Sequence, residues 1–106
     1  MKTEENKPAS TNDIEKTYHK LRRRYSDIKA PNHIVKRTRE GLYLPACGKA
    51  ESQSVLVEWS RIDEPLKALQ TARRLAHKLW ASREMIADFL DLTFAHFKWA
   101  KGFPYL

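Results

Sequence analysis

Apolar residues recur at helical spacing near the start of the chain. They follow one another at steps of four, three, four and three residues: Ile14, Tyr18, Leu21, Tyr25 and Ile28. This spacing places them along one narrow face of a helix. Asn12, followed three residues later by Glu15, forms a capping-box pattern at the beginning of that face. Pro31 disfavours a helical backbone at the residue before it, so the pattern predicts a helix over residues 12–29.

The middle of the chain alternates short apolar runs with turn signals. HIVKRT (33–38), GLYLPAC (41–47) and SVLVEW (54–59) are rich in β-branched or other apolar residues. TREG and GKAESQ separate these runs and are typical of turns, with Gly41 expected in the left-handed conformation. We therefore predict a three-stranded antiparallel sheet. The alternative is a short helix over residues 33–40, with Asn32 as its N-cap and Gly41 just beyond its end.

The last predicted strand, SVLVEW, has two distinct faces. Val55, Val57 and Trp59 point to one side, whereas Leu56 and Glu58 point to the other.

A long helical segment follows, from Pro65 to about residue 101. Its first half has an apolar side made of Leu66, Leu69, Ala72, Ala76, Leu79 and Trp80. Its second half is apolar around more than half of its circumference, through Met85, Ile86, Phe89, Leu90, Leu92, Phe94, Phe97 and Trp99. Ser82 is a capping residue that would begin a separate helix, so a kink is expected near residues 81–83. The remaining polar stripe contains three acids, Glu84, Asp88 and Asp91, which we expect to pair with arginines.

These elements indicate an α+β fold with an N-terminal amphipathic helix, a small antiparallel sheet and a long, kinked C-terminal helix. Residues 1–11 are polar and are expected to form a disordered tail, and residues 12–106 are expected to form one domain. Cys47 is the single cysteine, which excludes an internal disulfide and a zinc-finger site and fits a reducing compartment such as the cytoplasm. The chain shows neither a secretory signal nor an apolar run of about 20 residues, the length that spans a membrane.

Positive charge is concentrated in the first half of the chain. The formal net charge is +7, and residues 1–49 hold 12 lysines and arginines against 6 acids. Clustered cations suit a phosphate backbone, because arginine and lysine donate to its oxygens. The predicted contacts are Arg22, Arg23, Arg24, Lys36, Arg37 and Arg39, extended by Arg73, Arg74 and Lys78 if the later helix packs alongside. Tyr18, Tyr25 and Tyr43 lie near these cations in the sequence and are candidates to stack on bases.

The sequence contains no signature of catalysis. Its four histidines lack metal-ligand spacing, and nucleotide-binding and nucleophile motifs are missing. We therefore expect neither enzymatic activity nor a metal or other cofactor.

The aromatic C-terminal segment indicates a partner. A helix that is apolar on most sides needs cover on most sides, so we expect a homo-oligomer or a larger protein to contact Phe89, Phe94, Phe97, Trp99 and Phe103. The predicted function is that of a non-catalytic nucleic-acid-binding accessory or regulatory protein. The alternative is an adaptor or inhibitor that docks on a nucleic-acid-processing protein through the aromatic helix and the basic face.

Overall fold

The computed structural model describes residues 11–45 and 54–100 and has an α+β fold. The order of elements is α2 (Thr11–Arg23), β1 (Lys36–Arg37), β2 (Gly41–Leu44), β3 (Val55–Glu58), the 3₁₀ helix η1 (Trp59–Arg61), α3 (Pro65–Leu75) and α4 (Arg83–Ala100). The antiparallel sheet has the strand order β1-β2-β3. The predicted sheet and the N-terminal and C-terminal helices are therefore confirmed, and the alternative helix over residues 33–40 is not found. The expected tail and the turn GKAESQ lie mostly outside the described residues.

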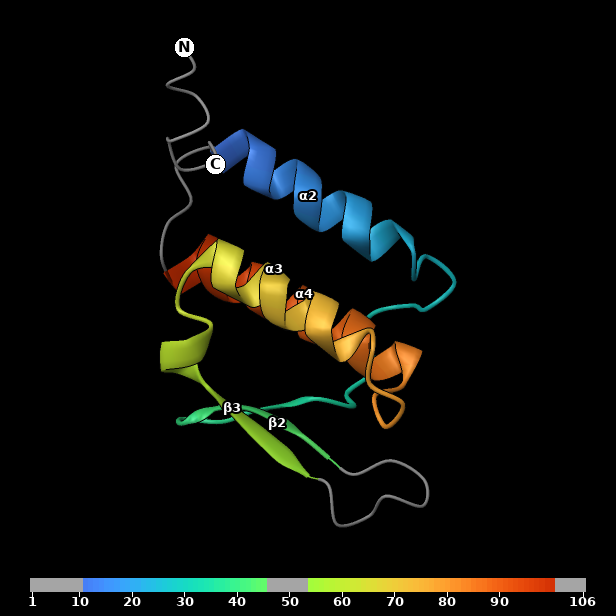
Figure 1. Ribbon diagram of the computed structural model, residues 1–106. Helices are drawn as coiled ribbons and strands as arrows, with labels where there is room; N and C mark the ends of the chain where they lie inside the picture. The colour runs from blue at the N-terminus through green and yellow to red at the C-terminus, as the bar shows by residue number, and fades with distance from the viewer. Residues whose placement is uncertain (1–10, 46–53, 101–106) are drawn as a thin grey trace.

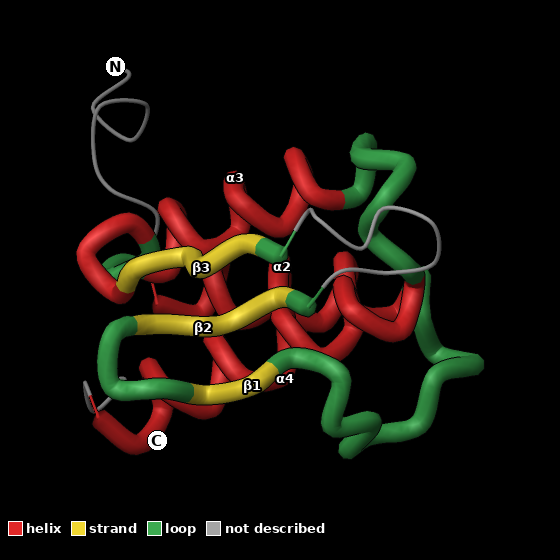
Figure 2. Tube along the Cα trace, turned by 90° about the horizontal axis from the view of Figure 1, so that it is seen from below, coloured by secondary structure: helices red, strands yellow, loops and turns green. Residues whose placement is uncertain are grey.

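The elements form three layers (Figure 1). Helices α3 and α4 pack against each other in the middle, α2 lies on one side of this pair, and the sheet lies on the other. Figure 2 views the molecule from the sheet side, with the three strands in front of the helices. The inner sheet face buries Leu42, Leu44 and Val57, whereas Tyr43 and Leu56 are exposed on the outer face. This alternation confirms the two-sided pattern predicted for β3.

Helix α2 ends earlier than the apolar spacing predicts. After Arg23 the backbone N–H groups of Arg24, Tyr25 and Ser26 bond to carbonyls three residues back, which is the tighter pattern of a terminal turn. The predicted apolar positions nevertheless lie in the core, since Tyr18, Leu21, Tyr25 and Ile28 are all buried. The apolar seam is thus correct, although its last part is a turn rather than a regular helix.

The long C-terminal segment is divided into two helices. Helix α3 ends at Leu75, and α4 begins at Arg83, where the Ser82 hydroxyl accepts a hydrogen bond from the Met85 N–H (3.1 Å). This confirms Ser82 as a capping residue, but the interruption is a connection of seven residues rather than a kink. The apolar side predicted for α3 was partly wrong, because Leu66, Ala76 and Leu79 are exposed. The buried side of α3 consists of Ala68, Leu69, Ala72 and Leu75.

The turn between β1 and β2 depends on Gly41 for a reason other than the predicted one. Gly41 does not adopt a left-handed backbone; instead, a Cβ atom there would lie 2.1 Å from the Val57 carbonyl oxygen. Glycine therefore permits the close approach of β2 and β3. The Thr38 hydroxyl completes the turn, since it donates to the Gly41 carbonyl (2.8 Å) and accepts from the Gly41 N–H (3.1 Å).

Candidate functional site

The three consecutive arginines at the end of α2 have different environments. The Arg22 guanidinium donates to both carboxylate oxygens of Asp91, through Nε at 2.9 Å and Nη2 at 3.3 Å. It also donates to the backbone carbonyls of Tyr25 and Ile28, so it closes the end of α2 as it ties this end to α4. Arg22 is therefore removed from the predicted phosphate contacts, because its donors are engaged within the fold. Arg23 and Arg24 remain exposed.

Arg24 and Arg73 meet across a groove between α2 and α3. One part of this groove, about 410 Å³ in volume, is lined by Leu21, Arg24, Tyr25, Arg73, Ala76 and His77. The adjoining part, about 200 Å³, is lined by Thr17, Lys20, Leu21, Arg24 and Arg73. Helix α3 thus packs alongside α2, as the predicted extension of the basic surface requires. We call this feature the α2–α3 groove.

The charged side chains that line the α2–α3 groove are all basic among the described residues. Its lining contains no acidic side chain, and Lys20, Arg24 and Arg73 take part in no ion pair recorded for the described part of the chain. Lys20 lies on α2 and Arg24 in the turn that follows it, and both line the same part of the groove. His77 follows Arg73 by four residues and adds an imidazole N–H donor. Sequence reasoning left His77 out of the site, although the i,i+4 spacing on a basic helix was a usable signal.

Arg74 and Lys78 belong to a different groove, between α3 and β3. This groove has a volume of about 160 Å³ and is lined by Val55, Leu56, Val57, Arg61, Thr71, Arg74, Leu75, Lys78 and Trp80. Arg73 and Arg74 are separated by about 100° around the helix axis, so these adjacent arginines line different grooves on α3. We call this second feature the α3–β3 groove. It differs from the first in the larger number of apolar residues in its lining, which are Val55, Leu56, Val57, Leu75 and Trp80.

Lys36, Arg37 and Arg39 lie apart from both grooves. Lys36 and Arg37 form β1, Arg39 lies in the following turn, and all three are exposed. Because the sheet and α2 lie on opposite sides of the α3–α4 pair, these cations do not form one continuous surface with Arg24 (Figure 1). The predicted footprint is therefore divided into three separate groups of cations.

The tyrosines proposed to stack on bases are mostly inaccessible. Tyr18 and Tyr25 are 3% and 6% exposed, respectively. The Tyr18 hydroxyl donates to Thr93 Oγ1 (3.2 Å), and the Arg83 guanidinium lies 5.0 Å from the centre of the Tyr25 ring. Both rings therefore belong to the core, where the helical periodicity also places them. Tyr43 alone of the three is exposed, on the outer face of the sheet.

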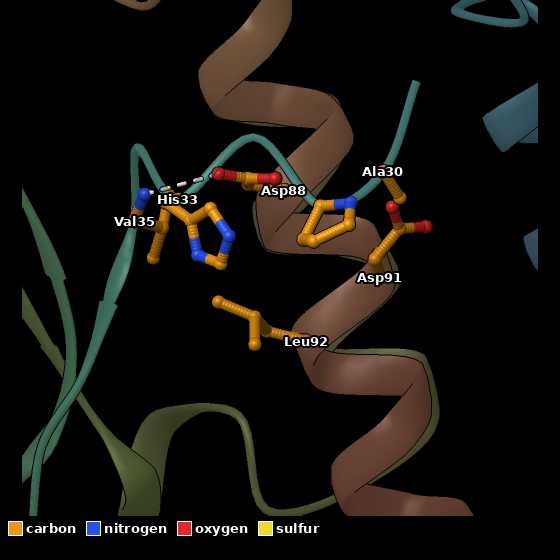
Figure 3. Close-up of a pocket in the computed structure, with 7 residues that line it drawn as sticks. Ala30, His33, Val35, Asp88, Asp91 and Leu92 are labelled. Atoms are coloured by element: carbon orange, nitrogen blue, oxygen red, sulfur yellow. Dashed lines mark hydrogen bonds between the residues drawn. The ribbon is translucent and has the colours of Figure 1, made fainter. Parts of the chain in front are cut away.

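A small pocket of about 100 Å³ lies where residues 30–35 cross α4 (Figure 3). Asp88 projects from α4 into this crossing and is 4% exposed. Its carboxylate accepts hydrogen bonds from the backbone N–H groups of Asn32 (3.2 Å), Ile34 (2.5 Å) and Val35 (3.2 Å). These bonds explain why the predicted strand 33–38 shrinks to two residues, because the N–H groups of residues 34 and 35 point at α4 instead of a neighbouring strand. His33, which lies between Asn32 and Ile34, has a backbone φ angle of 62°.

Two of the three acids in the polar stripe of α4, Asp88 and Asp91, are thus bound by other groups of the same chain. Asp91 pairs with an arginine, as predicted, whereas Asp88 holds backbone N–H groups. Within the described residues, no cluster of three metal-ligating side chains occurs.

The aromatic interface predicted for α4 needs correction. Residues 85–90 are all buried, so neighbouring elements of the same chain already cover this stretch on every side. Phe89 and Phe97 are 0% and 1% exposed and are not available to a partner. Phe94 is half-buried against the rings of Tyr18 and His19. The Trp99 side chain and Phe103 lie outside the described part of the structure.

Comparison with known proteins adds no functional information. No family model, curated protein or solved structure matched the chain. Within the described residues, no helix has both the length and the apolar character that crossing a membrane requires.

Proposed function

We propose that the protein is a nucleic-acid-binding accessory protein that contacts the phosphate backbone through the α2–α3 groove. The observation that supports this proposal is that Arg24, in the turn after α2, and Arg73, on α3, line one groove without acidic lining residues. Guanidinium groups suit phosphate because their paired N–H donors match two of its oxygens. Lys20 provides a further cation and His77 a further donor along the same groove.

The shape of the groove favours a backbone over a base-reading surface. The described lining offers cations and the aliphatic side chains of Leu21 and Ala76. The Tyr25 ring is buried, which leaves the His77 imidazole as the accessible ring in the lining. Binding through such a surface is expected to depend on charge and to be nearly independent of sequence. A regulatory or accessory role fits this chemistry better than recognition of a specific site.

The test is fluorescence anisotropy of labelled duplex DNA, single-stranded DNA and RNA with the full chain, at several salt concentrations. Three groove cations should give log affinity against log salt a slope of about −3 for a duplex. The double substitution Arg24→Ala/Arg73→Ala should weaken binding at least about tenfold and make the slope shallower by about two.

Lys36→Ala/Arg37→Ala is the matched control, because it also removes two exposed cations, but from the opposite side of the molecule. It should leave both affinity and slope nearly unchanged. Equal losses in the control and the groove variant would assign binding to general charge rather than to the groove. Absence of binding at low salt would refute the proposed function.

A further inference from the structure

The two edges of the sheet are protected differently. Strand β1 is two residues long and carries exposed Lys36 and Arg37, and a short, charged strand discourages pairing with another chain. Strand β3 is four residues long and exposes Leu56 at 43%. Within the described residues β3 pairs only with β2, so its other edge is open to a further strand.

The register shows which backbone groups of β3 face outward. The Trp59 N–H donates to the Glu40 carbonyl (3.0 Å), and the pairing continues through Leu42 opposite Val57. Because hydrogen-bonded and non-hydrogen-bonded pairs alternate in an antiparallel ladder, Leu56 and Glu58 occupy the non-hydrogen-bonded positions toward β2. Their N–H and C=O groups therefore point toward the open edge.

The α3–β3 groove lies beside this edge and combines two chemistries. Val55, Leu75 and Trp80 provide apolar surface, and Arg61, Arg74 and Lys78 provide three cations. None of these cations takes part in an ion pair recorded within the described residues. An apolar floor next to an open strand and a cationic wall is suited to a peptide rather than to a phosphate backbone, which needs neither apolar surface nor an open strand.

We propose that the edge of β3 and the α3–β3 groove bind an acidic, extended segment of a partner protein by strand addition. The added strand would pair with the outward backbone groups of Leu56 and Glu58. Its side chains would alternate between the two faces of the sheet. Acidic side chains would point inward, with their methylene groups against Leu75 and Trp80 and their carboxylates at Arg74 and Lys78. Apolar side chains would lie outside, beside Leu56. This activity is independent of nucleic-acid binding, because it uses the other side of α3.

The probe is a fluorescein-labelled peptide of alternating valine and glutamate, about eight residues long, titrated with the full chain. Binding is expected, and Arg74→Ala/Lys78→Ala should weaken it at least about tenfold. The matched control, Arg24→Ala/Arg73→Ala, removes the same number of cations from the α2–α3 groove. It should change peptide affinity less than about twofold, even if it abolishes nucleic-acid binding.

Backbone pairing is tested separately from charge. Two further peptides carry N-methyl groups on either all valine or all glutamate amides. Since only alternate amides of an added strand face β3, one of these peptides should lose binding and the other should retain it.

Three outcomes would overturn the proposal. The parent peptide could fail to bind at about 500 μM. Both methylated peptides could bind like the parent, which would show attraction by charge alone. Single-stranded DNA could displace the peptide with the same dependence on Arg74 and Lys78, which would make this groove a nucleic-acid site.

Discussion

The side of α4 that faces residues 28–35 and the α2–α3 groove are both built from charged side chains, but they use charge in opposite ways. Around α4, Asp88 accepts bonds from three backbone N–H groups, and Asp91 pairs with Arg22. In the groove, Arg24 and Arg73 are both lining residues, and the lining contains no acidic residue of the described chain. Asp88 and Asp91 are therefore engaged within the fold, and the groove lining provides no acidic counter-charge to its cations.

The largest effect is expected from Asp88→Ala. This substitution leaves three backbone N–H groups without their acceptor, and hydrogen bonds to a charged group are worth more than neutral ones. The free energy of unfolding should fall by about 3 kcal/mol or more, as measured by urea denaturation. Asp88→Asn keeps one acceptor oxygen and should cost about half as much. A loss below about 1 kcal/mol for Asp88→Ala would mean that water replaces the carboxylate.

A smaller loss is expected when Arg22 is replaced. Arg22→Ala removes a half-buried ion pair and two bonds to carbonyls at the end of α2, and it should cost about 2 kcal/mol. Arg23→Ala, one residue along, should change the free energy of unfolding by less than about 0.5 kcal/mol because its side chain is exposed. Equal losses in the free energy of unfolding for the two substitutions would contradict a structural role that belongs to Arg22 and not to Arg23.

Arg22 and Arg24 should differ in nucleic-acid binding. Arg24→Ala alone should make the salt slope shallower by about one, corresponding to one phosphate contact. Arg22→Ala should leave the slope unchanged, provided that measurements are made where the variant is folded. A change of slope with Arg22→Ala would show that its guanidinium leaves Asp91 when nucleic acid binds.

The smallest effect concerns the exposed pair of Lys67 and Asp63. The hydrogen bond and the negative charge of Asp63 raise the pKa of Lys67 above its ordinary value of 10.5. A raised pKa in the folded chain means that the stabilisation is present below pH 10.5 and disappears as pH rises through the higher value. Lys67→Met should thus lower the melting temperature slightly at pH 7 and not at all at strongly alkaline pH. A pH-independent difference would indicate loss of packing instead.

Local patterns predicted the regular elements of this chain. The apolar spacing from Tyr18 to Ile28 identified core positions, and alternation in SVLVEW identified both faces of β3. Ser82 marked the beginning of α4. Each of these signals lies within one helical turn or one strand of the feature that it predicts, which is why sequence alone was sufficient.

The candidate sites depend on contacts between distant segments. Asp88 binds N–H groups more than 50 residues earlier, on an irregular stretch whose path has no sequence period. The sequence does not distinguish among the three consecutive arginines 22–24. Arg22 differs from the other two because it lies next to Asp91 of α4 in the folded chain. Likewise, α4 is apolar on most sides because it packs against α3 and lies between α2 and the sheet. The sequence alone does not distinguish such a central helix from one that contacts another protein.

Gly41, the first residue of β2, is expected to be conserved among relatives of this protein. Any side chain at Gly41 would collide with the backbone of β3, whereas the exposed cations can change without disturbing the fold. Thr38 is bound to this glycine by two hydrogen bonds, and Leu42 and Leu44 after it are completely buried. We therefore expect distant relatives to keep the pattern Thr-x-x-Gly-Leu-x-Leu of residues 38–44, even where the basic clusters have diverged.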